Sequence, residues 1–183
     1  MINRIIAIIL LVILLPIFLT VSLLIFFSDG FPILFWSKRF GRQNALFLMP
    51  KFRTMKKNTP DLPTHELKRT RNYLIKFGGF LRKTSLDEIP QLICVLNGSL
   101  NFVGPRPALH NQSDLIKKRS KKNIQTLRPG ITGWAQINGR DDLTVDKKVE
   151  LDEYYLNNKS ILLNFKIIII TIVQIFFPKG VKH

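Results

Sequence analysis

The chain has 183 residues, which allows one compact domain of ordinary size plus an accessory segment and excludes a second large domain. Its 28 basic and 12 acidic residues give a net charge of +16, so we expect it to bind polyanions such as nucleic acid, anionic lipid headgroups or phosphorylated small molecules. The single cysteine, Cys94, excludes a disulfide framework and a metal-binding cysteine pair, and the histidines lack the spacing of metal ligands.

The first predicted element is a membrane helix. The run from Ile5 to Phe27 carries no charge and is long enough to cross the hydrocarbon core of a bilayer. It is longer than the apolar part of a cleavable signal peptide, and residues 26–29 form a poor cleavage site. Basic residues flank both ends, and Pro16 near the middle removes one helical hydrogen bond, for whose freed carbonyl Ser22 and neighbouring side chains are the candidate partners. A plain span and a bent, re-entrant helix with both ends in the cytoplasm both fit this pattern.

The next segment, residues 28–50, is a transition region that mixes aromatic and basic side chains, which suits the lipid headgroup layer; a loop packed on the domain surface is the alternative. A second apolar run at 161–177 is interrupted by polar residues and is short for a span. We expect it to be a core helix or an interfacial helix, with Lys166 reaching outward.

Between these segments, turn residues and apolar spacing predict short elements. In chain order they are a loop at 58–63, a helix ending near Gly78, a helix at 85–96, a stiff turn at 104–107, a charged surface helix at 114–122, a turn at 128–130, a short strand within 131–138 and a helix starting near Glu150. The predicted fold class is α/β, mostly helical with short strands.

Asp87 and Glu88 are the only carboxylates between Leu67 and Ser113, a basic part of the chain. Locally, Ser85 followed by Glu88 matches a capping box, which favours a purely structural interpretation. The same first helical turn also favours phosphate binding, and an ionised aspartate there can attack a phosphoryl group to form an acyl phosphate. Magnesium would bridge such a carboxylate and a pyrophosphate.

Other basic residues fit phosphoryl chemistry. Arg106 lies between two prolines that restrict its backbone, and an arginine fork matches phosphate oxygens. Lys51 and Arg53 add charge in another short segment. The chain contains neither a P-loop motif nor a dinucleotide-binding glycine motif, so the common nucleotide folds receive no support.

Five segments together resemble the bacterial sugar transferase family, the small monotopic phosphoglycosyltransferases that start glycan assembly on a lipid carrier. They are KFRTM (51–55), LRKTSLDEIPQL (81–92), LNGSLNFVGPRPAL (96–109), RPGITGWAQINGR (128–140) and ELDEYY (150–155). The resemblance runs from the N-terminal helix to about Ile170.

The resemblance implies a two-step reaction. Asp87 would attack the β-phosphate of a UDP-sugar in the presence of Mg²⁺, which Asp87 would also bind, and UMP would leave. Undecaprenyl phosphate would then take the phosphosugar from the aspartate, giving undecaprenyl diphosphate sugar. Glu88 would place the metal or handle a proton.

The resemblance also implies a substrate pocket. Lys51, Arg106 and Asp152 match family positions tied to activity, and Arg82, Arg128 and Arg140 are further candidates for the same anion pocket. Family members carry a re-entrant helix broken near its middle, which favours the re-entrant alternative for Pro16, although Leu15 stands where the family commonly has serine.

We therefore expect a re-entrant helix at 1–29 and a cytoplasmic catalytic domain with interfacial helices at 30–183. The expected location is a bacterial inner membrane, facing the cytoplasm, and the expected partners are membrane lipids, undecaprenyl phosphate and a UDP-sugar, for which an N-acetylated hexosamine with or without a 6-deoxy carbon is preferred. The reaction would be the first membrane step of surface polysaccharide or glycan assembly. A membrane-tethered nucleic-acid-binding module and a non-catalytic adaptor are the alternatives, and we expect no nucleic acid partner.

Overall fold

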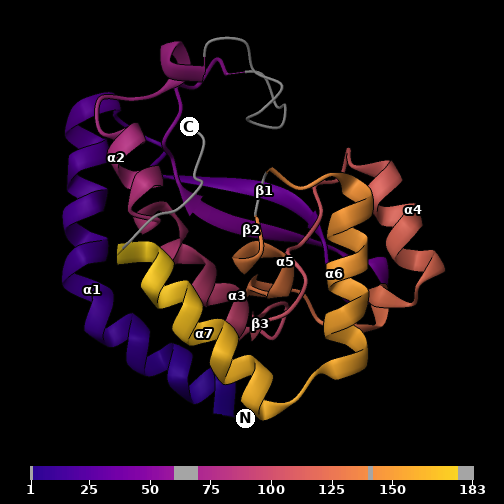
Figure 1. Ribbon diagram of the computed structural model, residues 1–183. Coiled ribbons are helices and arrows are strands. Elements are labelled where there is room, and N and C mark those ends of the chain that lie inside the picture. The colour runs from indigo at the N-terminus through magenta and orange to yellow at the C-terminus, as the bar shows by residue number, and fades with distance from the viewer. Residues whose placement is uncertain (1, 60–69, 140–141, 177–183) are drawn as a thin grey trace.

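The computed structural model describes residues 2–59, 70–139 and 142–176 (Figure 1). Its helices and strands are α1 (Ile2–Asp29), β1 (Leu34–Phe40), β2 (Leu46–Phe52), α2 (Gly78–Lys83), α3 (Leu92–Leu96), β3 (Asn101–Val103), α4 (Ser113–Lys121), β4 (Gly130–Thr132), α5 (Trp134–Ile137), α6 (Val145–Asn158) and α7 (Ile161–Phe176). Short 3₁₀ helices are η1 (Arg42–Asn44), η3 (Thr70–Tyr73), η4 (Leu86–Gln91) and η5 (Ile124–Thr126). The expected mixture of many helices and short strands is confirmed.

Helix α1 is the element of membrane length. It has 28 residues, which corresponds to about 42 Å at 1.5 Å per residue, and among the described helices it alone is long and apolar enough to cross a membrane. It bends part-way along its length (Figure 1) and contains Pro16. The Ser22 hydroxyl donates to Phe18 O at 2.7 Å and Thr20 Oγ1 donates to Pro16 O at 2.9 Å. Of the candidate partners for the carbonyl freed by Pro16, Ser22 is wrong, because a proline frees the carbonyl four residues before it and Ser22 bonds Phe18 O, which follows it.

Both halves of α1 pack on the rest of the protein. Near the N-terminus, Ala7 is buried in a cluster with Met49, Cys94, Val95 and Leu100. Near the other end, Val21 and Ile25 are buried with Phe52, Ile75 and Leu81. Most other large apolar side chains of α1 are exposed. One stripe of the helix therefore holds it to the domain along its length, and the remaining surface is apolar.

Most of the transition region at 28–50 forms a β-hairpin, which corrects the loop alternative. Strands β1 and β2 are antiparallel, with Leu34 opposite Phe52 and Phe40 opposite Leu46. The sequence concealed this hairpin because Trp36 and Leu48 are exposed, so apolar and polar residues do not alternate along the strands. Strands β3 and β4 are parallel and short.

Two predicted helices are corrected. The helix expected to end near Gly78 instead begins there, because the residues just before it pair with the segment after β2: Leu74 forms an antiparallel bridge with Met55, and Ile75 N donates to Thr54 O at 3.1 Å. Residues 60–69, which include most of the predicted 58–63 loop, lie outside the described ranges. The helix expected at 85–96 is divided into η4 and α3, and Ser85 is left-handed, with a φ of 56° and no side-chain cap, so the capping box is wrong.

The C-terminal elements agree better with the sequence. Helix α4 confirms the charged surface helix, β4 provides the short strand, and α6 begins earlier than expected, after Thr144 caps it. In α7, Ile167 is fully buried whereas Ile161 and Leu162 are largely exposed, so one face packs on the domain and the other is outward and apolar. Lys166 is exposed as expected, and its ammonium group lies 5.7 Å from the centroid of the Trp134 ring.

Candidate active site

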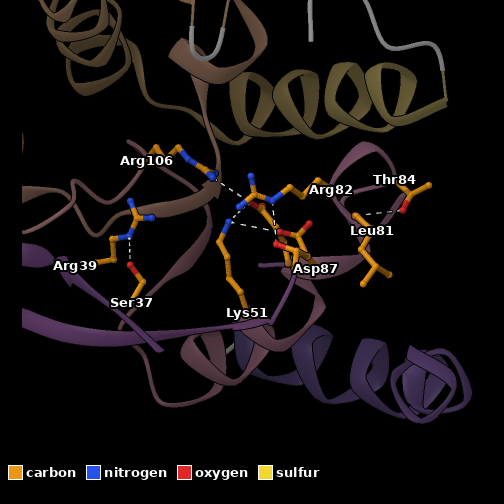
Figure 2. Close-up of polar contacts among 10 residues, drawn as sticks. Ser37, Arg39, Lys51, Leu81, Arg82, Thr84, Asp87 and Arg106 are labelled. Atoms are coloured by element: carbon orange, nitrogen blue, oxygen red, sulfur yellow. Dashed lines mark hydrogen bonds and ion pairs between the residues drawn. The ribbon is translucent and has the colours of Figure 1, made fainter. Parts of the chain in front are cut away.

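The acidic pair lies on η4, against strand β2. Lys51 Nζ, from the end of β2, is 2.7 Å from Glu88 Oε1 and 3.9 Å from Asp87 Oδ2. Arg106 Nη2, from the turn between β3 and α4, donates to the same Glu88 oxygen at 2.9 Å. Figure 2 shows Lys51, Arg82 and Arg106 reaching toward Asp87 from three different segments. The fold thus brings three predicted basic site residues, Lys51, Arg82 and Arg106, to the acidic pair.

Arg82 comes from α2 and is oriented by Thr54, which follows β2. Its Nε donates to Thr54 Oγ1 at 2.9 Å. Burial lowers the pKa of Arg82, and the charge of Asp87 opposes that shift. An arginine beside a carboxylate in a partly buried site is placed to bind an anionic group that approaches the carboxylate.

The two neighbouring carboxylates differ electrostatically. Burial raises the pKa of Asp87; Glu88 adds to that shift, and Lys51, Arg82 and Arg106 oppose it. Burial would also raise the pKa of Glu88, but the charges and hydrogen bonds of Lys51 and Arg106 outweigh it and hold the pKa well below its usual range. Glu88 is therefore ionised at neutral pH and anchors two cations, whereas Asp87, whose pKa is raised, is the more basic carboxylate.

Asp152 is in a different place from the acidic pair. It lies on α6, is 1% exposed, and its Oδ2 accepts from Arg119 Nη2 at 2.6 Å and Nε at 3.0 Å. Arg119 Nη1, from α4, also donates to the backbone oxygen of Arg106 at 2.8 Å. Burial raises the pKa of Asp152, and Arg119 opposes this. Through Arg119, Asp152 thus supports the turn that presents Arg106. Arg119 was not predicted as a site residue, because it stands in an ordinary basic run.

The other predicted binding residues stay predictions. Arg128 is exposed in the turn before β4, and its backbone oxygen lies beside Gly104, where an added Cβ would be 2.5 Å away. Within the described residues no contact joins Arg128 to the acidic pair. Arg140 lies outside the described residues.

The donor set also bears on magnesium. Within the described part of the chain, no three His, Cys, Asp or Glu side chains form a group able to hold a metal ion. Mg²⁺ commonly binds one or two carboxylates together with the phosphates of a substrate. Glu88 is occupied by Lys51 and Arg106, so Asp87 is the carboxylate that fits such a role, as a single protein ligand completed by a pyrophosphate.

A carboxylate pair among basic side chains, beside an apolar helix of membrane length, makes a site for anionic substrates at a membrane. Comparison with known proteins agrees: the profile of the family described as "Bacterial sugar transferase" matches residues 1–178. The chain belongs to the bacterial sugar transferase family and is therefore a transferase. The apolar helix and the family together indicate membrane association.

Curated relatives carry more specific names. The chain is 38% identical over 157 residues to "Uncharacterized sugar transferase EpsL" of Bacillus subtilis (strain 168), covering 84% of this chain and 75% of that protein. It is 37% identical over 188 residues to the UDP-glucose:undecaprenyl-phosphate glucose-1-phosphate transferase of Xanthomonas campestris pv. campestris, covering 97% of this chain and 38% of that protein. It is 35% identical over 167 residues to galactosyl transferase CpsE of Streptococcus agalactiae serotype III (strain NEM316), covering 85% and 37%.

Proposed function

We propose that the chain transfers a sugar 1-phosphate from a UDP-sugar to undecaprenyl phosphate, giving undecaprenyl diphosphate sugar and UMP. The observation that carries this proposal is the contrast within the acidic pair: Glu88 binds Lys51 and Arg106, and adjacent Asp87 is left as the more basic carboxylate beside the same cations. The name of the relative from Xanthomonas campestris supplies the substrate classes.

In the first step a carboxylate oxygen of Asp87 bonds to the β-phosphorus of the UDP-sugar. The bond from that phosphorus to the bridging oxygen breaks, and UMP leaves with the electron pair. Lys51, Arg82 and Arg106 offset the charge of the phosphates, which would otherwise repel the carboxylate. Mg²⁺, held by Asp87 and the phosphates of the donor, would supply further neutralisation of the pyrophosphate.

In the second step an oxygen of undecaprenyl phosphate bonds to the same phosphorus. The acyl phosphate bond breaks, and Asp87 leaves with the electron pair as a free carboxylate. No net proton or redox partner is required. Arg106 and Lys51 keep their places through both steps because Glu88 retains them.

We infer that α1 is re-entrant and that the site faces the cytoplasm at a bacterial inner membrane. The packing of Ala7 and Ile25, at opposite ends of α1, on one domain supports this, because a domain that holds both ends of the helix keeps them on one side of the bilayer. Cysteines introduced as Ile2→Cys and Phe31→Cys should both react with a membrane-impermeant maleimide from the cytoplasmic side. The native Cys94 is buried, with its pKa raised to about 11, so it should stay unlabelled. Labelling of the two sites from opposite sides would establish a span instead.

The identity of the transferred sugar can be tested with a panel of UDP-sugar donors. The names of the relatives specify glucose and galactose and give no support to the predicted N-acetylated hexosamine. UMP release should therefore be compared for UDP-glucose, UDP-galactose and the UDP-N-acetylhexosamines, each with undecaprenyl phosphate and Mg²⁺. The proposed role in starting polysaccharide or glycan assembly depends on that result.

The decisive experiment uses a donor labelled in the sugar phosphate and no lipid acceptor. We expect at most one UMP released per protein and the label attached to Asp87, followed by turnover when undecaprenyl phosphate is added. The Asp87→Asn variant should release no UMP while still binding membranes. Undiminished release by that variant would refute the nucleophile, and no release by the unmodified protein with any donor would favour a non-catalytic adaptor.

A further inference from the structure

Four consecutive residues, 51–54, connect the active site to the membrane helix. Lys51 contacts the acidic pair, and the Phe52 ring packs on Phe18 of α1 with centroids 4.8 Å apart. Arg53 contacts the end of α1, and Thr54 accepts a hydrogen bond from Arg82. Any shift of this segment relative to α1 therefore shifts the site relative to the membrane.

Of these four residues, Arg53 makes the most side-chain hydrogen bonds. It is 5% exposed, and its Nη2 donates to Gly30 O at 2.6 Å and to Asp29 O at 3.1 Å. Its Nε donates to Pro32 O at 2.6 Å, and its Nη1 forms an ion pair with the Asp29 carboxylate. The last carbonyls of a helix lack partners within the helix and carry the negative end of its dipole, so a guanidinium group is a strong cap there. Arg53 thus caps α1 from the position immediately after β2, the strand that carries Lys51.

We infer that Arg53 is a positioning residue that fixes α1 relative to β2 and so sets the height of Asp87 above the bilayer for the lipid acceptor. This inference rests on the proposed two-step transfer. The soluble donor can reach the site at any height, but the phosphate of a polyprenyl lipid stays in the headgroup plane. Because α1 is the element that lies in the lipid, a shift of its capped end relative to β2 moves Asp87 relative to the headgroup plane, and a misplacement of about 1 Å can cost about a hundredfold in rate.

The test separates the two steps. Arg53→Lys keeps the charge and loses the fork, and Asp29→Asn keeps the arginine and loses its ion pair, so one variant remains if the other fails to fold. With the best donor of the panel and no acceptor, both should release their single UMP within about twofold of the unmodified rate. Transfer to undecaprenyl phosphate in nanodiscs should fall about tenfold or more, and transfer to a short, water-soluble polyprenyl phosphate should be normal.

A matched control is Arg42→Lys, since Arg42 Nε also donates to a backbone oxygen, Thr126 O at 3.0 Å, but does not contact α1. It should leave both steps unchanged. Depth offers a readout independent of activity: a spin label on Phe27→Cys should change its bilayer depth when Arg53→Lys is added and keep it when Arg42→Lys is added. The buried Cys94 will not compete for the label.

Two results would overturn the inference. Equal loss in both steps, extending to the short acceptor, would mean that Arg53 merely holds Lys51 in place. Normal transfer in nanodiscs with an unchanged label depth would mean that α1 is positioned without it. A failure of the proposed function itself is distinguishable, because then the unmodified protein would release no UMP with any donor.

Discussion

Replacing Glu88 with glutamine tests the electrostatic account of the site. The substitution keeps the shape of the side chain and removes the negative charge of the carboxylate, whose Oε1 accepts hydrogen bonds from Lys51 at 2.7 Å and from Arg106 at 2.9 Å. Each hydrogen bond to a charged group contributes about 1.5–3 kcal/mol, and the neutral amide oxygen retains part of both bonds. We therefore expect the Glu88→Gln variant to lose about 2–4 kcal/mol of unfolding free energy at pH 7, which lowers Tm by about 2–4 °C per kcal/mol in a chain of this size.

The pH dependence of this loss follows from the pKa of Glu88. Its pKa in the folded protein lies well below the ordinary value of 4.5, so Glu88 stabilises the fold fully above that ordinary value. The contribution disappears as the pH falls through the lower, folded pKa. The difference in Tm between Glu88→Gln and the unmodified protein should accordingly be constant near neutrality and shrink in acid.

Thermal unfolding in one detergent over a series of pH values measures this difference. Glu150→Gln is the matched control, because Glu150 also pairs with a lysine, Lys147 at 2.7 Å, but its side chain is 64% exposed. Exposed ion pairs contribute about 0–1 kcal/mol, so the control should barely change Tm. Equal Tm values for Glu88→Gln and the unmodified protein at pH 7 would refute the claim that Glu88 anchors the two cations.

Three further outcomes follow from the contacts. Asp87→Asn should abolish UMP release yet unfold at the same or a higher temperature at pH 7, because burial raises the pKa of Asp87 and its ionised form therefore weakens the fold. The gain in Tm should vanish below pH 3.8, the ordinary pKa of an aspartate, and a clear loss of Tm at pH 7 would contradict this account. Asp152→Asn removes the counter-charge that holds Arg119, so we expect a higher KM for the UDP-sugar, since Arg119 then holds the Arg106 turn less firmly. An unchanged KM would mean that Arg119 does not position Arg106. Gly130→Ala would place a Cβ 2.1 Å from Gly104 N and should cost about 3 kcal/mol or more, measured as Tm, with Gly79→Ala as the roomy control at 3.7 Å from its nearest neighbour.

The helices that depend on the character of neighbouring residues were predicted from the sequence. The uncharged run of α1 and the polar, basic character of α4 are properties of neighbouring residues, and both helices formed as expected. The hairpin of β1 and β2 was missed because Trp36 and Leu48 are exposed, so its strands lack the period of two that a half-buried strand carries.

The site was predicted in its chemistry but not in its geometry. Lys51, Arg82 and Arg106 were named as anion-binding residues, and the fold gathers them near Asp87. The ion pairs of the site join segments that lie far apart in the chain. Periodicity does not predict which of the many basic residues is buried beside which carboxylate. Arg119, from a basic surface helix, is the clearest example.

The difference between the two adjacent carboxylates depends on the element that carries them. A capped α-helix starting at Ser85 would have used Glu88 to bond the backbone, as in a capping box. In η4 the left-handed Ser85 makes no side-chain cap, and Glu88 N donates instead to Ser85 O at 3.1 Å in a 3₁₀ turn. The Glu88 side chain is thereby free to bind Lys51 and Arg106, and the cations it holds lie beside Asp87. Because no capping box forms, the Glu88 carboxylate can hold Lys51 and Arg106 beside Asp87.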